Sequence, residues 1–265
     1  MRVLDLPITP IHEVTFWNAG RHSMGPCLAQ LPILHGRVDL LPEGYDALVV
    51  TSDLQGREDH EGAPRRLLGE ILPAILRGVV LPQLGLSFDA KVAALLAGDF
   101  YTLPLVDKRG GTGDVQMVWA AFAESFDRVL GVPGNHDLFH SVHHPRDLPA
   151  NACYLDDATS ELGQLKIAGL GGIIGNPTKP HRRKLEDFLH TADRLLGENP
   201  DVFLMHEGPE GEDATQPGLP GLRVLAACRS AFVIRGHKHW VRPLAEIQGG
   251  MQVLNVEGRA VVLTR

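Results

Sequence analysis

The sequence predicts a single α/β domain built as a four-layer sandwich, with two mixed β-sheets packed face to face and flanked by helices. Three observations predict this class. Five apolar runs each end in a polar residue that can bind a metal, amphipathic helical segments lie between several of the runs, and short strands joined by glycine turns close the chain. A chain of 265 residues is long enough for one domain with a well-buried core.

The composition is that of an ordinary globular protein and disfavours several partners. Hydrophobic residues make up 44% of the chain, and the formal net charge is −7. An acidic chain is poorly suited to grip a long phosphate backbone, whereas bound metals would still attract a small anion. There is no membrane-length apolar run and no signal-peptide layout, and the three cysteines are widely spaced. We expect a cytoplasmic protein with no membrane or nucleic-acid partner, and its oligomeric state stays open.

The first third of the chain predicts an extension, a core strand and a helix. Residues 1–46 are rich in proline and glycine and predict an N-terminal extension packed on the domain, with one strand-like piece at 14–17. The first core strand is expected at 46–50. Leucine and isoleucine side chains repeat on one helical face of residues 64–77. Pro73 should kink or split that helix.

Three more helices and a group of short strands follow. Helices are expected at 114–126, where Asp114 can cap, at about 180–196, and at 219–227. The end of the chain, 241–265, predicts a terminal β-meander. Its strands are expected at 243–247, 252–256 and 259–263, joined by the glycine turns Gly249-Gly250 and Glu257-Gly258.

Five polar clusters follow apolar runs in a fixed order. They are Ser52-Asp53-Leu54-Gln55-Gly56, Gly98-Asp99, Gly134-Asn135-His136-Asp137, Met205-His206 and Gly236-His237-Lys238-His239. Layered α/β proteins gather ligands at the carboxyl ends of their strands, so we expect these clusters to meet at one edge of the sandwich. Mixed oxygen and nitrogen ligands in this number suit two divalent ions better than one.

This order of motifs resembles the calcineurin-like metallophosphoesterases over roughly residues 46–240. The resemblance implies two divalent metal ions, with Mn favoured and Mg, Fe, Zn or Ni as alternatives. It also implies that Asp99 bridges both ions. The remaining implied ligands are Asp53, Gln55 and His239 for the first ion and Asn135, His206 and His237 for the second. Gln55 stands where most members carry histidine, and its neutral oxygen favours harder ions such as Mn²⁺ or Mg²⁺.

The resemblance further implies hydrolysis of a phosphoester or phosphoanhydride bond, by in-line attack of a hydroxide that bridges the two ions. His136 would face the phosphate and stabilise charge or protonate the leaving oxygen, while Asp137 would orient its ring. The expected substrate is a small phosphodiester or a nucleotide-derived pyrophosphate. The alternative is a non-catalytic protein-binding scaffold on the same fold with a weakened metal site. Only Gln55 favours that alternative.

Residues outside the motifs give weaker indications. Arg109 lies in the glycine-rich segment 107–113 and is a candidate for contacting phosphate, with a surface loop as the alternative. Three further histidines follow the third motif closely: His140, His143 and His144. They could line the rim of the site, but a solvated loop is the favoured interpretation.

Overall fold

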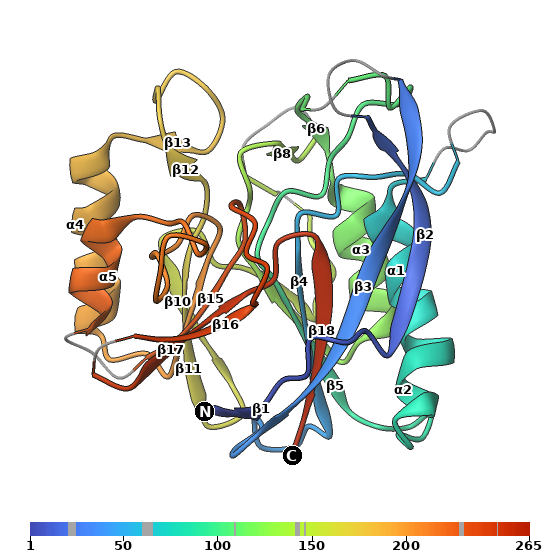
Figure 1. The fold of residues 1–265 in the computed structure, drawn as a ribbon, viewed down its shortest axis with the longest axis horizontal. Coiled ribbons are helices and arrows are strands. Elements are labelled where there is room, and N and C mark those ends of the chain that lie inside the picture. Colours follow the sequence, from blue (N-terminus) through green and yellow to red (C-terminus); the bar gives the residue numbers. More distant parts are fainter. Residues whose placement is uncertain are drawn as a thin grey trace.

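The computed structural model describes residues 1–20, 25–59, 66–108, 110–140, 144–145, 147–227, 231–247 and 249–265. Two β-sheets lie face to face, and helices cover the outer face of each sheet (Figure 1). This arrangement confirms the predicted four-layer sandwich of mixed sheets and helices.

The first sheet combines both ends of the chain with its first half. In spatial order it contains β1 (Val3–Asp5), β3 (Pro26–Val38), β18 (Arg259–Thr264), β4 (Ala47–Ser52), β5 (Val92–Leu96), β7 (Arg128–Gly131) and β9 (Ala152–Tyr154), with β2 (His12–Ala19) paired to β3. β4, β5 and β7 run parallel, so their carboxyl ends lie at the same edge of the sheet.

The second sheet comes from the second half of the chain. In spatial order it contains β10 (Ala158–Leu162), β11 (Leu165–Leu170), β14 (Val202–Met205), β15 (Phe232–Arg235), β17 (Met251–Asn255) and β16 (Leu244–Ile247). The four inner strands are parallel, and the two outer strands are antiparallel to their neighbours. Two small parallel pairs accompany the sheets: β6 (Gly113–Asp114) with β8 (Asp137–Leu138), and β12 (Ile173–Ile174) with β13 (Arg182–Arg183).

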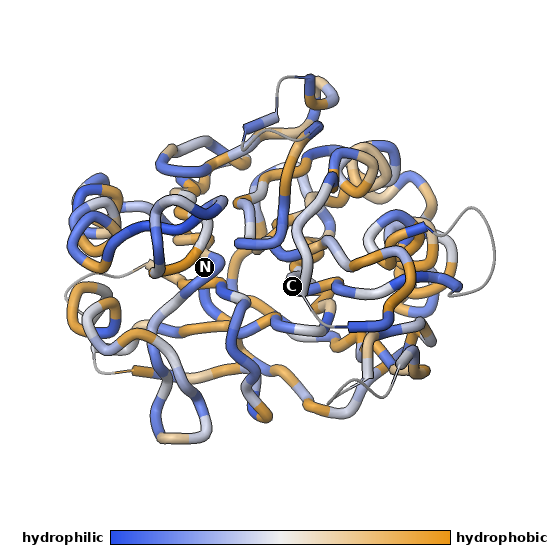
Figure 2. Tube along the Cα trace, turned by 90° about the horizontal axis from the view of Figure 1, so that it is seen from above, coloured by the Kyte–Doolittle hydropathy of each residue, from blue (hydrophilic) through white to orange (hydrophobic). Residues whose placement is uncertain are grey.

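Helices form the two outer layers. The first sheet is covered by α1 (Leu68–Ile75), the π-helical η2 (Leu76–Val80), α2 (Leu81–Gln83) and α3 (Gln116–Ser125), and the second sheet by α4 (Leu185–Gly197) and α5 (Pro220–Ala227). Hydrophilic and hydrophobic residues alternate along the helices at both sides of the molecule (Figure 2). No helix in the described ranges is long and apolar enough to cross a membrane.

Three apolar layers hold these four structural layers together. Trp119 and Phe122 lie between α3 and the first sheet. Aliphatic side chains such as Leu95 and Leu204 fill the space between the two sheets. Phe188 of α4 lies in the third layer, against the outer face of the second sheet. Removal of this apolar surface from water is the main force that holds the sheets and helices in place.

The predicted helices differ from the observed ones mainly at their starts. The helix expected over 64–77 begins at Leu68 in the described part of the chain, and α-helical bonding gives way to π-helical bonding after Ile75, two residues beyond Pro73. The N-cap residue of α3 is Val115, not the expected Asp114; Asp114 lies in β6 and accepts a local hydrogen bond from the Gln116 amide at 2.9 Å. The helix expected from 180 begins only at Leu185, because the preceding residues form β13.

Residues 1–46 were expected to form an extension packed on the domain, and the structure corrects this expectation. β3 pairs with β2 along its first half and with β18 along its second half, so the segment is part of the first sheet. The sequence predicted only the middle of β2. The prolines of β3 disfavour a strand in a sequence-based prediction, because proline has no N–H group to donate. In the structure Pro26 and Pro32 lie in the half of β3 that has a single neighbouring strand, where the missing N–H group is tolerated.

The expected C-terminal meander is wrong for its last strand. β16 and β17 form the predicted hairpin across Gly249-Gly250. β18 instead crosses to the first sheet, where it lies parallel to β3 and antiparallel to β4. Every residue of β17 and all but the last residue of β18 are buried, which is the pattern of central strands covered on both faces.

We predict that β18 is essential to stability because it lies at the centre of the first sheet. Leu263 is fully buried between the sheets, so Leu263→Ala should lower the free energy of unfolding by about 2–5 kcal/mol in urea denaturation. Leu4 is the control, since its side chain is 61% exposed and Leu4→Ala should change stability by less than about 0.5 kcal/mol. Equal effects of the two substitutions would contradict the central position of β18.

Candidate metal centre

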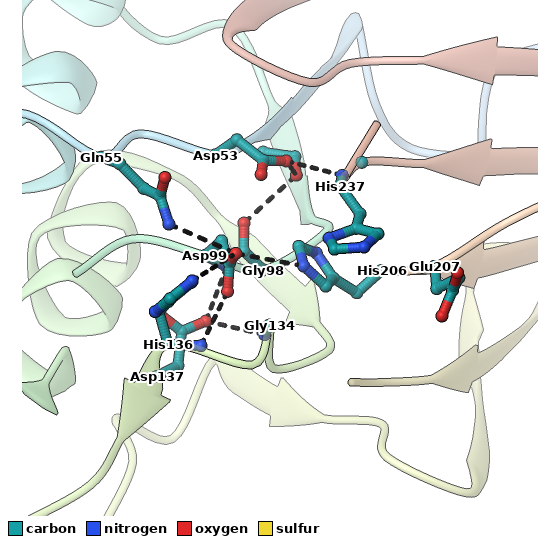
Figure 3. A network of polar contacts seen from close by, with 12 residues as sticks. Asp53, Gln55, Gly98, Asp99, Gly134, His136, Asp137, His206, Glu207 and His237 are labelled. Carbon is teal, nitrogen blue, oxygen red and sulfur yellow. Dashed lines mark hydrogen bonds and ion pairs between the residues drawn. The ribbon is translucent and has the colours of Figure 1, made fainter. Parts of the chain in front are cut away.

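The polar clusters meet where the carboxyl ends of strands from both sheets face one another. Asp53, Asp99 and Asn135 follow β4, β5 and β7, while His206 and His237 follow β14 and β15. Figure 3 shows these groups, apart from Asn135, converging on Asp99. Ligand atoms of Asp99, His206 and His237 lie within 4.8 Å of one another. The structure therefore assembles in space what the sequence spreads over 185 positions, from Asp53 to His237.

Three glycines allow the loops that carry the candidate ligands to approach one another closely. A Cβ at Gly134 would lie 2.0 Å from Asp99 Oδ1, and a Cβ at Gly236 would lie 1.9 Å from Ser52 Oγ. Gly98, with φ of +86°, would place a Cβ 2.3 Å from the Gly134 amide nitrogen. Any side chain at these positions would push the ligand-bearing loops apart.

Three of the ligand candidates have a left-handed backbone. The φ angles are 55° for Asp53, 60° for Asp99 and 69° for His237. Aspartate and histidine are among the residues that tolerate this region, but the conformation still costs free energy. Such strain is typical of functional sites, where the surrounding structure fixes the direction of a side chain.

Asp99 lies at the centre of the cluster. Its Oδ1 accepts a hydrogen bond from the His136 amide at 2.9 Å, and its Oδ2 accepts one from Gln55 Nε2 at 3.3 Å. Oδ2 also lies 3.3 Å from His206 Nε2. Burial alone would raise the pKa of Asp99, but the charge and hydrogen bond of His206 outweigh it and lower the pKa to about 2. Asp99 is therefore ionised and available to cations.

His206 is fully buried and oriented by the backbone. Its Nδ1 donates a hydrogen bond to the Ala97 carbonyl at 2.7 Å, which turns Nε2 toward Asp99. Burial would lower the pKa of His206, but the Asp99 charge raises it to about 10. The His237 ring lies 5.2 Å away, and burial together with the His206 charge lowers the pKa of His237 to about 3.

Asn135 gives the best evidence that the cluster binds a cation. The residue is 4% exposed, and its Oδ1 has no hydrogen-bond partner in the described part of the chain. A buried acceptor without a partner costs on the order of 1–3 kcal/mol. A cation would satisfy that oxygen. Carboxylate, amide oxygen and two imidazoles form a mixed donor set that suits a divalent transition metal, so these residues fit the second metal site implied by the sequence.

The first predicted metal site is more open. Asp53 Oδ2 accepts hydrogen bonds from the Ser52 hydroxyl and, at 3.0 Å, from the His237 amide. Burial, with the nearby Asp99 charge adding to it, raises the pKa of Asp53 to about 7. His239 is 62% exposed and lies outside the compact cluster, but it lines a cavity of about 240 Å³ together with Asp53 and Gln55. Asp53, Gln55 and His239, which are expected to complete the first site beside Asp99, thus share one cavity.

Asp137 has a different contact from the one expected. Its two carboxylate oxygens accept hydrogen bonds from three backbone amides: Asp99 at 2.7 Å, Phe100 at 2.8 Å and Gly134 at 2.8 Å. The His136 ring is instead held through Nδ1, which donates to the Gly111 carbonyl at 2.5 Å. The expectation that Asp137 orients this ring is therefore wrong. Asp137 ties together the loops that follow β5 and β7.

Other candidates from the sequence are not part of the cluster. Arg109 and His143 lie outside the described residues. His140 and His144 are exposed, as expected for a solvated loop, and His140 Nδ1 lies 3.1 Å from Asp114. Lys238 Nζ lies 3.6 Å from a carboxylate oxygen of the buried Glu207.

The sequence analysis missed Glu257. Its Oε2 accepts a hydrogen bond from His239 Nδ1 at 2.6 Å, so Nε2 is the ring nitrogen of His239 that can serve other contacts. No motif surrounds this residue, and it follows β17, far from the last polar cluster. Only the passage of the chain from one sheet to the other, over the edge where the ligands lie, brings Glu257 to the site.

The geometry agrees with the comparison with known families. The sequence model of the calcineurin-like phosphoesterases matches residues 47–241, and the chain belongs to this family. Its members are generally metal-dependent phosphoester hydrolases that use two metal ions, and the cluster of Asp99, His206 and His237 is a possible metal site of that kind. No curated protein sequence matches the chain.

We predict that Asp99 is shared by two ions. Asp99→Ala should lower the metal content of the protein at both sites, because one carboxylate supplies a ligand to each ion. Elemental analysis after loading with Mn²⁺ measures the change. Asp89→Ala, at an exposed position, is the control and should keep the wild-type metal content. An unchanged metal content in Asp99→Ala would contradict the assignment.

We predict that Glu257 strengthens metal binding through His239. Glu257→Gln keeps the size of the side chain but weakens the charge-assisted hydrogen bond to Nδ1. The affinity of the weaker Mn²⁺ site should fall about 10- to 100-fold in a calorimetric titration. Glu186→Gln, at an exposed position on α4, should leave both affinities unchanged. Wild-type affinity in Glu257→Gln would show that the contact does not position a ligand.

Proposed function

We propose that the protein hydrolyses a phosphoester or phosphoanhydride bond in a small substrate, using two divalent metal ions. One observation carries the proposal: the buried Oδ1 of Asn135 has no hydrogen-bond partner among the described residues. Asn135 directly precedes His136, whose amide contacts Asp99, and ligand atoms of Asp99, His206 and His237 lie within 4.8 Å of one another. Membership of the calcineurin-like phosphoesterase family supports the same reaction class.

The ligands divide into two sets around Asp99. Asp53, Gln55 and His239 would complete the first set, and Asn135, His206 and His237 the second. Bound divalent ions supply charge that stabilises the phosphoryl oxygens and lowers the pKa of water. Gln55 brings a neutral amide in place of an imidazole, which supports Mn²⁺ or Mg²⁺ at the first position.

His136 is suited to act on the substrate. The Gly111 carbonyl can only accept, so Nδ1 of His136 carries a proton and Nε2 is the nitrogen left for chemistry. Nε2 lies 3.9 Å from Asp99 Oδ2, at the centre of the cluster. When Nε2 is protonated as well, the ring is a cation that can stabilise charge on the phosphoryl group or give the Nε2 proton to the leaving oxygen. Asp137 would keep the loops on either side of the ring in place.

A small substrate fits the properties of the chain better than a polymer. The net charge is −7, and a nucleic-acid strand requires several cationic contacts. The favoured substrates are therefore a small phosphodiester or a nucleotide-derived pyrophosphate. We also propose a cytoplasmic location, which the free thiols of Cys27 and Cys153 support.

The non-catalytic alternative depended on Gln55. The Gln55 side chain points toward Asp99, and its Nε2 donates a hydrogen bond to Asp99 Oδ2 at 3.3 Å, which supports a role for this residue beside the cluster. A protein-binding scaffold has no comparable observation in its favour among the described residues.

Activity measured on metal-loaded protein tests the proposal. The protein, freed of metal and reloaded with Mn²⁺, Mg²⁺, Zn²⁺ or Ni²⁺, should hydrolyse bis(p-nitrophenyl) phosphate or small pyrophosphate compounds, with Mn²⁺ most effective. Chelation should abolish turnover, and restored Mn²⁺ should recover it. Metal binding without hydrolysis of any phosphomonoester, diester or pyrophosphate would contradict the proposed function.

We predict that His136 acts on the phosphate and binds no metal. His136→Asn should keep the wild-type metal content and lower kcat by about 10²–10⁴-fold, the usual contribution of a positioned acid or charge stabiliser. His140→Asn is the matched control, because His140 is an exposed histidine that follows β8, close to His136 in the chain. Loss of metal from His136→Asn, or full activity, would show that the assigned role is wrong.

A further inference from the structure

The cavity beside Asp53 and Gln55 is walled largely by residues outside the region that matches the family. Its volume is about 240 Å³. The lining residues outside positions 47–241 are Phe16, Asn18, Ala29, Gln30, Glu257 and Gly258. The predicted metal ligands thus lie inside the matched region, while the opposite wall comes from the β2–β3 hairpin and from the crossing between β17 and β18.

The hairpin is fixed to the loop that carries Gln55. The Trp17 amide donates to the Arg57 carbonyl at 2.7 Å, and the Arg57 amide donates to the Trp17 carbonyl at 2.8 Å. Phe16 lies directly on Gly56, where an added Cβ would be 2.1 Å from the phenyl ring. Since Gly56 follows Gln55 directly, the wall has a defined position relative to the first metal site.

The hairpin residues that line the cavity are Phe16, Asn18, Ala29 and Gln30. Side chains alternate between the faces of a strand, so Phe16 and Asn18 share a face of β2, while Thr15 lies on the other. Ala29 is directly opposite Phe16 in the register and belongs to the same face. Gln30 is opposite Thr15 and accepts a hydrogen bond from the Thr15 hydroxyl at 3.1 Å. Asn18 is the polar lining residue on the Phe16 face, and we therefore expect it to recognise a polar ligand.

The orientation of the Asn18 amide is set by its own strand. Its Oδ1 accepts a hydrogen bond from the Ala19 amide at 2.7 Å, so the NH₂ group is the part directed to other partners. Across the cavity, the Glu257 carboxylate can accept hydrogen bonds. A donor on one wall and an acceptor on the other match hydroxyl groups, which both donate and accept.

The size of the cavity limits the ligand. Pockets for drug-sized ligands measure about 300–1,000 Å³, so a cavity of about 240 Å³ suits a group the size of a sugar or glycerol. We propose that this cavity binds the hydroxyl-bearing alcohol part of a phosphate ester or pyrophosphate, and that Asn18 donates a hydrogen bond to an oxygen of that part. The inference rests on the proposed function and specifies the substrate class of the same site.

Two substrates that differ in hydroxyl groups test Asn18 as a specificity-determining residue. One is the p-nitrophenyl ester of thymidine monophosphate, which carries a sugar, and the other is bis(p-nitrophenyl) phosphate, which carries none. Asn18→Ala should raise KM for the thymidine ester about 3- to 10-fold, as expected for one lost hydrogen bond, with kcat nearly unchanged. Kinetics on bis(p-nitrophenyl) phosphate should stay within about twofold, since the contact does not involve the phosphate.

Matched variants separate this role from a structural one. Glu13→Gln changes an exposed residue of the same strand that does not line the cavity, and it should leave both substrates unaffected. Asn18→Ser can still accept from the Ala19 amide but reaches less far, so it should reproduce the selective rise in KM even if Asn18→Ala is poorly folded. Equal losses on both substrates, no loss on either, or the same selective loss in Glu13→Gln would overturn the proposal.

A binding experiment keeps the proposal distinct from the proposed function. If the wild-type protein hydrolyses neither ester with any metal, the proposed function fails, and calorimetry on the Mn²⁺-loaded protein then decides the subsite. Asn18→Ala should weaken binding of thymidine monophosphate about 3- to 10-fold relative to inorganic phosphate. Equal affinities of wild type and variant for thymidine monophosphate would overturn the subsite.

Discussion

The ionised, buried carboxylate of Asp99 is the group on which the rest of the site depends. It lies between two sheets at 3% exposure, where an isolated charge would be strongly disfavoured. His206, Gln55 and the His136 amide surround it, and each comes from a different loop. Each of these loops follows a strand of the sandwich. The surroundings of the Asp99 carboxylate therefore depend on how the two sheets are packed against each other.

The site also depends on three glycines, which have no side chain to keep the loops apart. Gly98, Gly134 and Gly236 let three loops approach so closely that a single methyl group would collide with a neighbouring backbone or ligand. Asp137 then secures two of these loops through three amide hydrogen bonds. Its carboxylate thus contributes by holding the backbone, which explains why a residue adjacent to His136 does not touch the His136 ring.

Much of the fold and of the site was predictable because the relevant signals are local. Apolar runs gave the central strands β4, β5, β7, β14 and β15, and a 3.6-residue period gave α3 with Trp119 facing inward. β3 and β18 were harder. β3 carries prolines whose effect depends on how many neighbours the strand has, and the partner of β18 lies more than 200 positions earlier in the chain. Neither property is visible in a window of neighbouring residues.

The sequence by itself determined which residues are candidates for metal binding, since residue type and spacing fix the available ligand chemistry and the family resemblance follows from them. Tertiary structure decided how those residues are used. It left Asn135 Oδ1 without a partner among the described residues, paired His239 with Glu257, and turned the Asn18 face of the hairpin toward the cavity. These contacts join segments that are distant along the chain. Their formation depends on the packing of two sheets against each other, which no local pattern encodes.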